Sequence, residues 1–220
     1  MDELTIVAIS SAVGGLTGKF VEKAWDSGEK WIQNFYNNHN ENVNKKAKEN
    51  SLKFLNELAL RIDKLEQNEK LTKEKINDSQ NHPEFSALLE KAIMSSAQTD
   101  SKEKHTILAR IVSERLKANP ESVLALNSKM AVDIIPFLTV NQMKILGLLV
   151  NLYKIRPSKY PLNQVYNKSS YQLWVDGYLT HQLKPFQNLN ISLINITHLE
   201  SLSCIRFNKF SFSKKAEFNP

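Results

Sequence analysis

Hydrophobic side chains recur at helical spacing along most of the chain. In residues 4–36 one apolar stripe follows a repeat of three and four residues, formed by Ile9, Val13, Leu16, Phe20 and Ala24. We predict one helix here, or two helices joined near Gly28. Residues 45–76 predict a long, highly charged helix with a narrow apolar stripe of Leu55, Leu58, Ile62 and Leu65. Two heptads are too few to predict a coiled coil, so we expect this stripe to pack on the rest of the protein or on a second copy.

A second stripe in the first segment consists of small residues. Ser10, Gly14 and Gly18 follow one another at intervals of four. Such spacing lets two helix backbones approach closely. The stripe is therefore a candidate helix-contact face for self-association, and a membrane-active helix over residues 4–36 is a further interpretation. The alternative is a helix that packs tightly within its own domain.

Residues 82–155 predict four helices separated by short joints. Their apolar positions recur at helical spacing, and each helix has a start signal. These signals are Pro83, the pair Asp100 and Glu103, Asn119–Pro120, and the pair Thr139 and Gln142. Short connections favour antiparallel neighbours, so we predict a compact four-helix bundle.

The end of the chain is typical of a winged-helix domain. A helix predicted over residues 191–204 passes directly into a strand-like stretch over residues 205–212. The helix at 139–153 would then be the first helix of that domain. The predicted fold is therefore mainly α, with a helical arm over residues 1–80, a bundle over residues 82–155, and a winged-helix-like region over residues 139–220. The last two share the helix at 139–153, and the last contains a short β-stretch.

The surplus of positive charge lies in the last seventy residues. The chain carries a net charge of +6 and has a pI of about 9.2, and residues 151–220 hold nine Lys and Arg against three Asp and Glu. The predicted helix at 191–204 contains neither Lys nor Arg. The cations flank it instead, and the candidate nucleic-acid backbone contacts are Lys184, Arg206, Lys209, Lys214 and Lys215. Cations placed in this way would hold phosphates and give little reading of base sequence. They are equally compatible with a solvated surface.

The sequence offers no pattern of catalytic or metal-binding residues. The five histidines lack the spacing of a metal site, and the single cysteine, Cys204, excludes an internal disulfide and favours a cytoplasmic location. The apolar run at residues 4–16 is too short to span a bilayer, and the chain begins without the positive segment of a secretory signal. We predict no enzymatic activity, no cofactor and no metal.

Several segments of the chain resemble bacterial proteins of the abortive-infection alpha type. They are residues 99–112, residues 130–142, Ile145–Leu146 and residues 198–205, where Ser203 occupies the position of a family glycine. The resemblance covers roughly residues 82–205. It implies a phage-defence context and supplies no catalytic or binding residues.

These observations together favour a non-enzymatic bacterial protein that acts by self-association or protein contact in phage defence. The expected partner is another protein or a second copy of the chain. A winged-helix regulator that binds nucleic acid is the first alternative. A membrane-active effector working through residues 4–36 is the second, and a membrane partner is less favoured.

Overall fold

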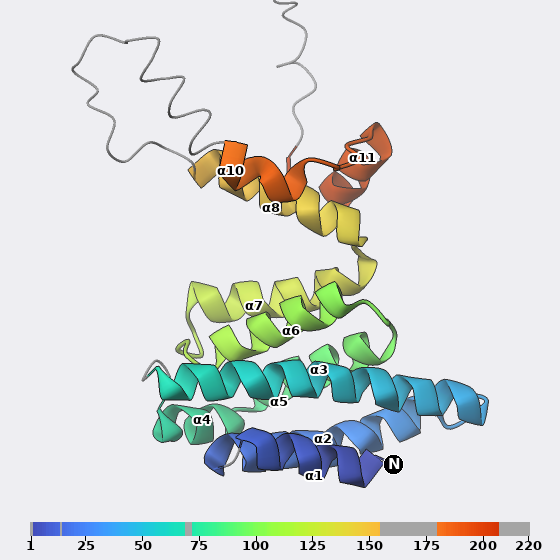
Figure 1. Ribbon diagram of the computed structural model, residues 1–220, viewed down its shortest axis with the longest axis vertical. Helices are drawn as coiled ribbons and strands as arrows, with labels where there is room; N and C mark the ends of the chain where they lie inside the picture. Colours follow the sequence, from blue (N-terminus) through green and yellow to red (C-terminus); the bar gives the residue numbers. More distant parts are fainter. Residues whose placement is uncertain (1, 14, 69–71, 155–179, 207–220) are drawn as a thin grey trace, which may run out of the picture. The chain divides into compact units, whose positions relative to one another are not determined.

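The structure, a computed structural model, describes residues 2–13, 15–68, 72–154 and 180–206. These residues form helices joined by turns and short connections, so the prediction of a mainly α protein is confirmed (Figure 1). The chain divides into an N-terminal unit, Met1–Phe137, and a C-terminal unit, Leu138–Pro220. Each unit is described by itself.

The first segment forms two helices, α1 (Asp2–Val13) and α2 (Gly15–Tyr36), which pack against each other (Figure 1). The break lies next to Gly15, whose φ of +55° is in the left-handed region that glycine adopts at little cost. The predicted joint near Gly28 is wrong. Gly28 lies inside α2, where a Cβ would stand 3.0 Å from the side chain of Ile93.

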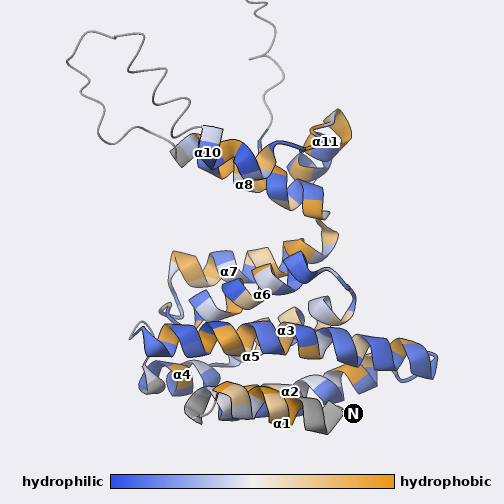
Figure 2. Cartoon of the chain, viewed as in Figure 1, coloured by the Kyte–Doolittle hydropathy of each residue, from blue (hydrophilic) through white to orange (hydrophobic). Residues whose placement is uncertain are grey.

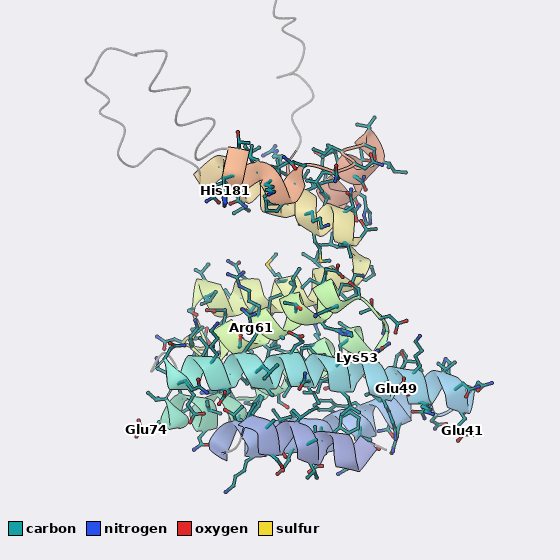
Figure 3. All side chains as sticks on the ribbon, in the orientation of Figure 1. Glu41, Glu49, Lys53, Arg61, Glu74 and His181 are labelled. Atoms are coloured by element: carbon teal, nitrogen blue, oxygen red, sulfur yellow. The ribbon has the colours of Figure 1, made fainter. Side chains whose placement is uncertain are left out.

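Helix α3 (Glu41–Gln67) is the central element of the N-terminal unit. It contacts α1, α2, α5 and α6, and its buried face includes Phe54, Leu55, Leu58 and Ile62. Charged side chains, among them those labelled at Glu49 and Lys53, lie along its length (Figure 3). The predicted apolar stripe is thus packed inside its own unit. The division into an arm over residues 1–80 and a separate bundle is not the division that the structure has, because the N-terminal unit extends across residue 80 to Phe137.

The remaining helices of this unit are α4 (Lys73–Gln80), α5 (Pro83–Ala97), α6 (Lys102–Arg115), α7 (Val123–Ile134) and the 3₁₀ turn η1 (Ile135–Phe137). Pro83 begins α5 as predicted. Two other start signals are displaced. The hydroxyl of Ser101, and not Asp100, accepts a hydrogen bond from the N–H of Lys104 at 3.3 Å, and Ser122 caps α7 three residues after the expected start.

Polar side chains in the interior satisfy backbone groups at the end of α5. The amide of Asn50 donates to the carbonyl of Ala97 at 3.3 Å. The buried His105 places its Nε2 at 2.9 Å from the carbonyl of Thr99 and 3.2 Å from that of Ser96. Since both partners are acceptors, Nε2 carries the proton. These contacts supply donors for carbonyls that the helix itself leaves unpaired.

The C-terminal unit contains α8 (Val140–Lys154), α10 (Thr180–Leu183), η3 (Lys184–Phe186) and α11 (Leu193–Ser201). The predicted four-helix bundle is therefore wrong, because its fourth helix belongs to this unit, while α5 and α6 pack on α3 and α7 packs on α5 and α6. The predicted capping pair of α8 is confirmed: Gln142 N–H donates to Thr139 Oγ1 at 3.1 Å, and Thr139 N–H donates to Gln142 Oε1 at 2.9 Å.

The same glutamine joins α8 to α11. Its Nε2 lies 2.8 Å from Nδ1 of His198, and Gln142 is buried. Because Oε1 already accepts from Thr139, the amide nitrogen must be the donor and Nδ1 the acceptor. The ring of His198 is therefore neutral, with its proton on Nε2.

The predicted winged-helix ending is not supported. Within residues 138–154 and 180–206 the structure has no strand, and Ile205 and Arg206 at the start of the expected β-stretch are not extended into one. Residues 207–212 lie outside the described part of the chain. Helix α11 ends instead in a turn in which Cys204 N–H donates to the carbonyl of Leu199 and Ser203 N–H to that of Glu200, both at 2.9 Å. Ser203 adopts a φ of +56° there, the conformation for which glycine is preferred.

Candidate functional surfaces

The predicted helix-contact face is used inside the N-terminal unit. Ser10 and Gly18 are both buried, and a Cβ on Gly18 would lie 2.7 Å from the carbonyl oxygen of Ser10. The two small residues therefore let α1 and α2 approach each other within one chain. Gly14 lies outside the described residues. Several apolar side chains of α2 are likewise buried in the core, among them Phe20, Trp25 and Ile32, although Phe35 near the end of the helix is exposed. Among the described helices, none has the length and apolar character needed to cross a membrane.

Helix α7 has apolar side chains on two opposite faces. Ala125, Ser128 and Val132, at i, i+3 and i+7, are buried against the unit. The same spacing places three large apolar side chains on the other face, where their exposed fractions are 72% for Val123, 54% for Leu126 and 58% for Met130. The exposed residues Leu124 and Phe137 extend this surface, and hydrophobic residues, in orange, lie along α7 in Figure 2. We call Val123, Leu124, Leu126, Met130 and Phe137 the α7 face.

The α7 face is held in place by polar contacts at its end. Lys104, at the start of α6, donates to the carbonyl of Pro136 at 3.1 Å, and Lys91 of α5 pairs with Asp133 of α7 at 2.6 Å. Desolvation lowers the pKa of Lys104 from its ordinary value. The sequence contained a signal for this surface, since a helix that is apolar on all sides is either fully buried or has a partner.

An ion pair between a buried arginine and a partly buried glutamate lies between the end of α6 and the start of α5. The side chain of Arg115 is 1% exposed, and its Nη2 stands 3.6 Å from Oε2 of Glu84, while Nη1 donates to the carbonyl of Ala118 at 3.1 Å. Arg115 Nε and Nη2 and Glu84 Oε1 have no hydrogen-bond partner. Sequence reasoning did not identify this pair, because the helix register of residues 84 and 115 is known only once the helices are packed.

The basic residues of the C-terminal unit are placed as follows. Lys184 is exposed on η3, and Arg206 is exposed after α11. Lys209, Lys214 and Lys215 lie outside the described residues. Beside Lys184 the structure places Lys144 of α8, since both lysines line one cleft. Lys144 was not predicted from the sequence, because it lies far along the chain from the residues that flank the helix at 191–204.

The candidate chemistry elsewhere is limited. Among the described residues no three His, Cys, Asp or Glu side chains gather closely enough to hold a metal ion. Partial burial raises the pKa of the Cys204 thiol, which lowers the fraction of reactive thiolate.

A small pocket between α2 and α5 is lined mainly by Phe20, Trp31 and Phe85, and Lys23 is the ionisable side chain among its described lining residues.

Comparison with known proteins gives one family match. A family model described as ":-like" matches residues 18–217. The chain belongs to this family. No curated protein and no solved structure matches the chain.

The match to the ":-like" family begins within α2 and crosses the boundary between the two units. Helices α2 and α3 are thus part of the family sequence, although they lie outside the segments that resemble the abortive-infection alpha type. The description of the ":-like" family gives no activity or partner. The abortive-infection resemblance therefore stays a prediction.

Proposed function

We propose that this protein acts by protein contact, through self-association of the α7 face, and that it does so without catalysis. The observation that carries the proposal is the exposure of Val123, Leu126 and Met130 side by side on a helix whose opposite face is packed. Contiguous exposed apolar side chains of this size mark interaction sites more often than they occur by chance.

A second copy of the chain is the occupant that the surface supports best. Two helices that pair about a two-fold axis present the same stripe to each other, so an apolar stripe is complementary to its own copy. The polar positions beside this stripe, Lys129 and Asp133, carry opposite charges. The N-terminal unit has nineteen Lys and Arg against twenty Asp and Glu, so net charge does not oppose the pairing of two copies.

The expected association is weak. One helix face of three turns buries less than the ~800 Å² per partner of a standard interface. We therefore expect a dissociation constant roughly in the micromolar range. Sedimentation velocity of the full chain at increasing concentrations should show a monomer that converts to a dimer.

Substitutions on the α7 face test this assignment. Leu126→Lys with Met130→Lys should leave a monomer at all concentrations, because two charges would have to be desolvated on pairing. Asn56→Lys with Leu60→Lys adds the same two charges at exposed positions of α3, outside the α7 face, and should leave the association constant within about twofold of the wild type. A wild-type chain that stays monomeric throughout, or an α7 double variant that associates like the wild type, would contradict the proposal.

A place in phage defence rests on the resemblance in residues 82–205. If self-association is needed for that role, cells producing the wild-type chain should reduce phage plaque numbers and cells producing the Leu126→Lys, Met130→Lys variant should not. Equal plaque numbers with the wild type and with an empty vector would remove this part of the proposal and leave the association itself untouched.

A further inference from the structure

A polar cleft in the C-terminal unit lies between the first turns of α8 and the segment that follows α10. Its described lining residues are Val140, Asn141, Lys144, Lys184, Pro185, Gln187, Asn188 and Leu189. Lys144 and Lys184 are exposed, and no carboxylate is among these lining residues. The cleft therefore combines two cations with three side-chain amides.

The two walls of the cleft are tied together at both ends. The side-chain amide of Asn141 donates to the carbonyl of Asn190 at 2.7 Å, and its oxygen accepts from the N–H of Asn190 at 3.3 Å. Phe186 packs against α8 at Gly147, where a Cβ would lie 3.4 Å from the ring. The spacing of Lys144 and Lys184 is thus set by the packing of the backbone segments that carry them and does not depend on a ligand.

The charge of the unit makes the cleft a site for an anion. Residues 138–220 hold ten Lys and Arg against three Asp and Glu. The three carboxylates leave the sequence of this unit with a surplus of seven positive charges. The N-terminal end of α8 adds a partial positive charge on the same wall.

The exposure of both lysines favours a polymer over a small anion. A single exposed ion pair contributes at most about 1 kcal/mol, so one phosphate would be held weakly in this cleft. A nucleic-acid backbone offers many phosphates in a row, and each lysine that neutralises one of them releases bound counterions. No aromatic ring is among the described lining residues, so the stacking of unpaired bases that single-strand binding proteins use is not supplied here.

We infer that this cleft binds the phosphate backbone of double-stranded nucleic acid, with Lys144 and Lys184 as the phosphate contacts and little dependence on base sequence. Asn141 is engaged in holding the walls, which leaves the amides of Gln187 and Asn188 to contact phosphate or sugar oxygens. This inference does not depend on association through the α7 face.

The test is fluorescence anisotropy of the full chain with a labelled duplex DNA of mixed sequence, over a series of potassium chloride concentrations. The wild type should bind at low salt and weaken steeply as salt rises. Lys144→Gln with Lys184→Gln should weaken binding about tenfold to a hundredfold at low salt, and the slope of log K against log salt should become about 2 units shallower. Lys144→Arg with Lys184→Arg should bind like the wild type, because it keeps both charges.

A matched control separates the cleft from net charge. Lys19→Gln with Lys45→Gln removes two exposed cations from the N-terminal unit and should leave the affinity within about twofold of the wild type. Equal losses in the two glutamine variants would overturn the assignment to the cleft, and a wild-type chain that does not bind at low salt would overturn it entirely. Displacement of the duplex by an equal phosphate concentration of inorganic tripolyphosphate would show a small-anion site and would also overturn it. A single strand that binds more tightly than the duplex would contradict the choice of partner.

Discussion

The N-terminal and C-terminal units differ in the balance of charge available to their side chains. The N-terminal unit has nearly equal numbers of basic and acidic residues, and ion pairs join its helices, as between Lys48 and Glu29 at 2.6 Å and between Lys46 and Asp100 at 2.8 Å. The C-terminal unit has ten basic residues and three acidic ones. Basic residues in the first unit are therefore matched in number by acidic ones, whereas the second unit has seven more basic residues than acidic ones.

The interiors differ as well. The N-terminal unit has one continuous apolar core to which α1, α2, α3, α5 and α6 each contribute at least two buried side chains, whereas α4 and α7 contribute one each, Ile76 and Val132. Among the described residues of the C-terminal unit, the buried apolar side chains are Leu138, Ile145 and Leu199, and Gln142 is buried with them. The first unit is held by apolar area, whereas specific polar contacts and helix caps carry a larger share in the second. Substitutions that target one kind of contact should therefore separate the two units.

The largest effect on the free energy of unfolding is expected at Arg115 and Glu84, the charged pair inside the N-terminal unit. Arg115→Ala removes a buried guanidinium, leaves Glu84 without its cation and opens a cavity, and should lower the free energy of unfolding by about 3–5 kcal/mol. Replacing the pair together, with Arg115→Met and Glu84→Gln, should restore most of the loss, because the arginine already has unsatisfied donors. Chemical denaturation of the wild type, the Arg115→Ala variant and the double variant measures these free energies of unfolding. A loss below about 1 kcal/mol for Arg115→Ala would show that the pair does not hold α5 to α6.

A smaller effect is expected from the polar contact that joins the helices of the C-terminal unit. Gln142→Ala removes one half of the capping box of α8 and the donor to His198, and should cost about 2 kcal/mol. Hydrogen exchange should localise the loss to α8 and α11 and leave α3 protected. Faster exchange spread over both units would contradict the separation described above.

The chemistry of this contact gives a second measurement. Gln142→Glu keeps an acceptor for the N–H of Thr139 but presents a carboxylate, which has no proton to donate, to the acceptor Nδ1 of His198. It should therefore keep the capping half of the contact and lose the half that joins α8 to α11, at a cost of about 1–3 kcal/mol. Hydrogen exchange should be faster in α11 than in the wild type, and unchanged exchange there would contradict the donor role of Gln142.

The sequence predicted the helices better than it predicted their grouping. Pro83 and the pair Thr139 and Gln142 identify helix starts because those residues act locally, within one turn. The grouping depends on contacts between residues far apart in the chain. The apolar stripe of α3 alone is compatible with a peripheral arm and with a central helix. Only the packing of α1, α2, α5 and α6 around α3 shows that it is central.

The candidate sites show the same limit. Lys184 was identified from local charge, but Lys144 joins it only because η3 packs on α8. The small residues Ser10 and Gly18 correctly indicated a close helix contact, and this contact joins α1 and α2 of the same chain, with Gly15 in a left-handed conformation at the start of α2. The winged-helix prediction relied on a direct passage from helix to strand after residue 204, whereas the chain enters a left-handed turn at Ser203.

That turn supplies a stabilising substitution. Ser203 adopts a left-handed φ, which costs a residue with a side chain roughly 1 kcal/mol relative to glycine. Ser203→Gly should therefore stabilise the C-terminal unit by about 1 kcal/mol, less the added entropy of glycine in the unfolded chain. Hydrogen exchange in α11 should slow while α3 stays unchanged. Slower exchange in the N-terminal unit as well would indicate that the two units unfold together.

The smallest effect concerns the exposed pair Lys46 and Asp100, which tests whether ion pairing in the N-terminal unit has a measurable share in its stability. The hydrogen bond from Lys46 lowers the pKa of Asp100 below its ordinary value of 3.8. A carboxylate with a lowered pKa contributes stability above its unfolded pKa, and that contribution is lost as pH falls through the folded value. Asp100→Asn should therefore melt slightly below the wild type at pH 7, and the two melting curves should converge when the pH falls below the folded pKa of Asp100. Because both side chains are more than half exposed, salt should reduce the difference at pH 7. A difference in melting temperature that persists at the lowest pH would have to come from another property of the Asp100 side chain. In that case the ion pair would make no measurable contribution to the stability of the N-terminal unit.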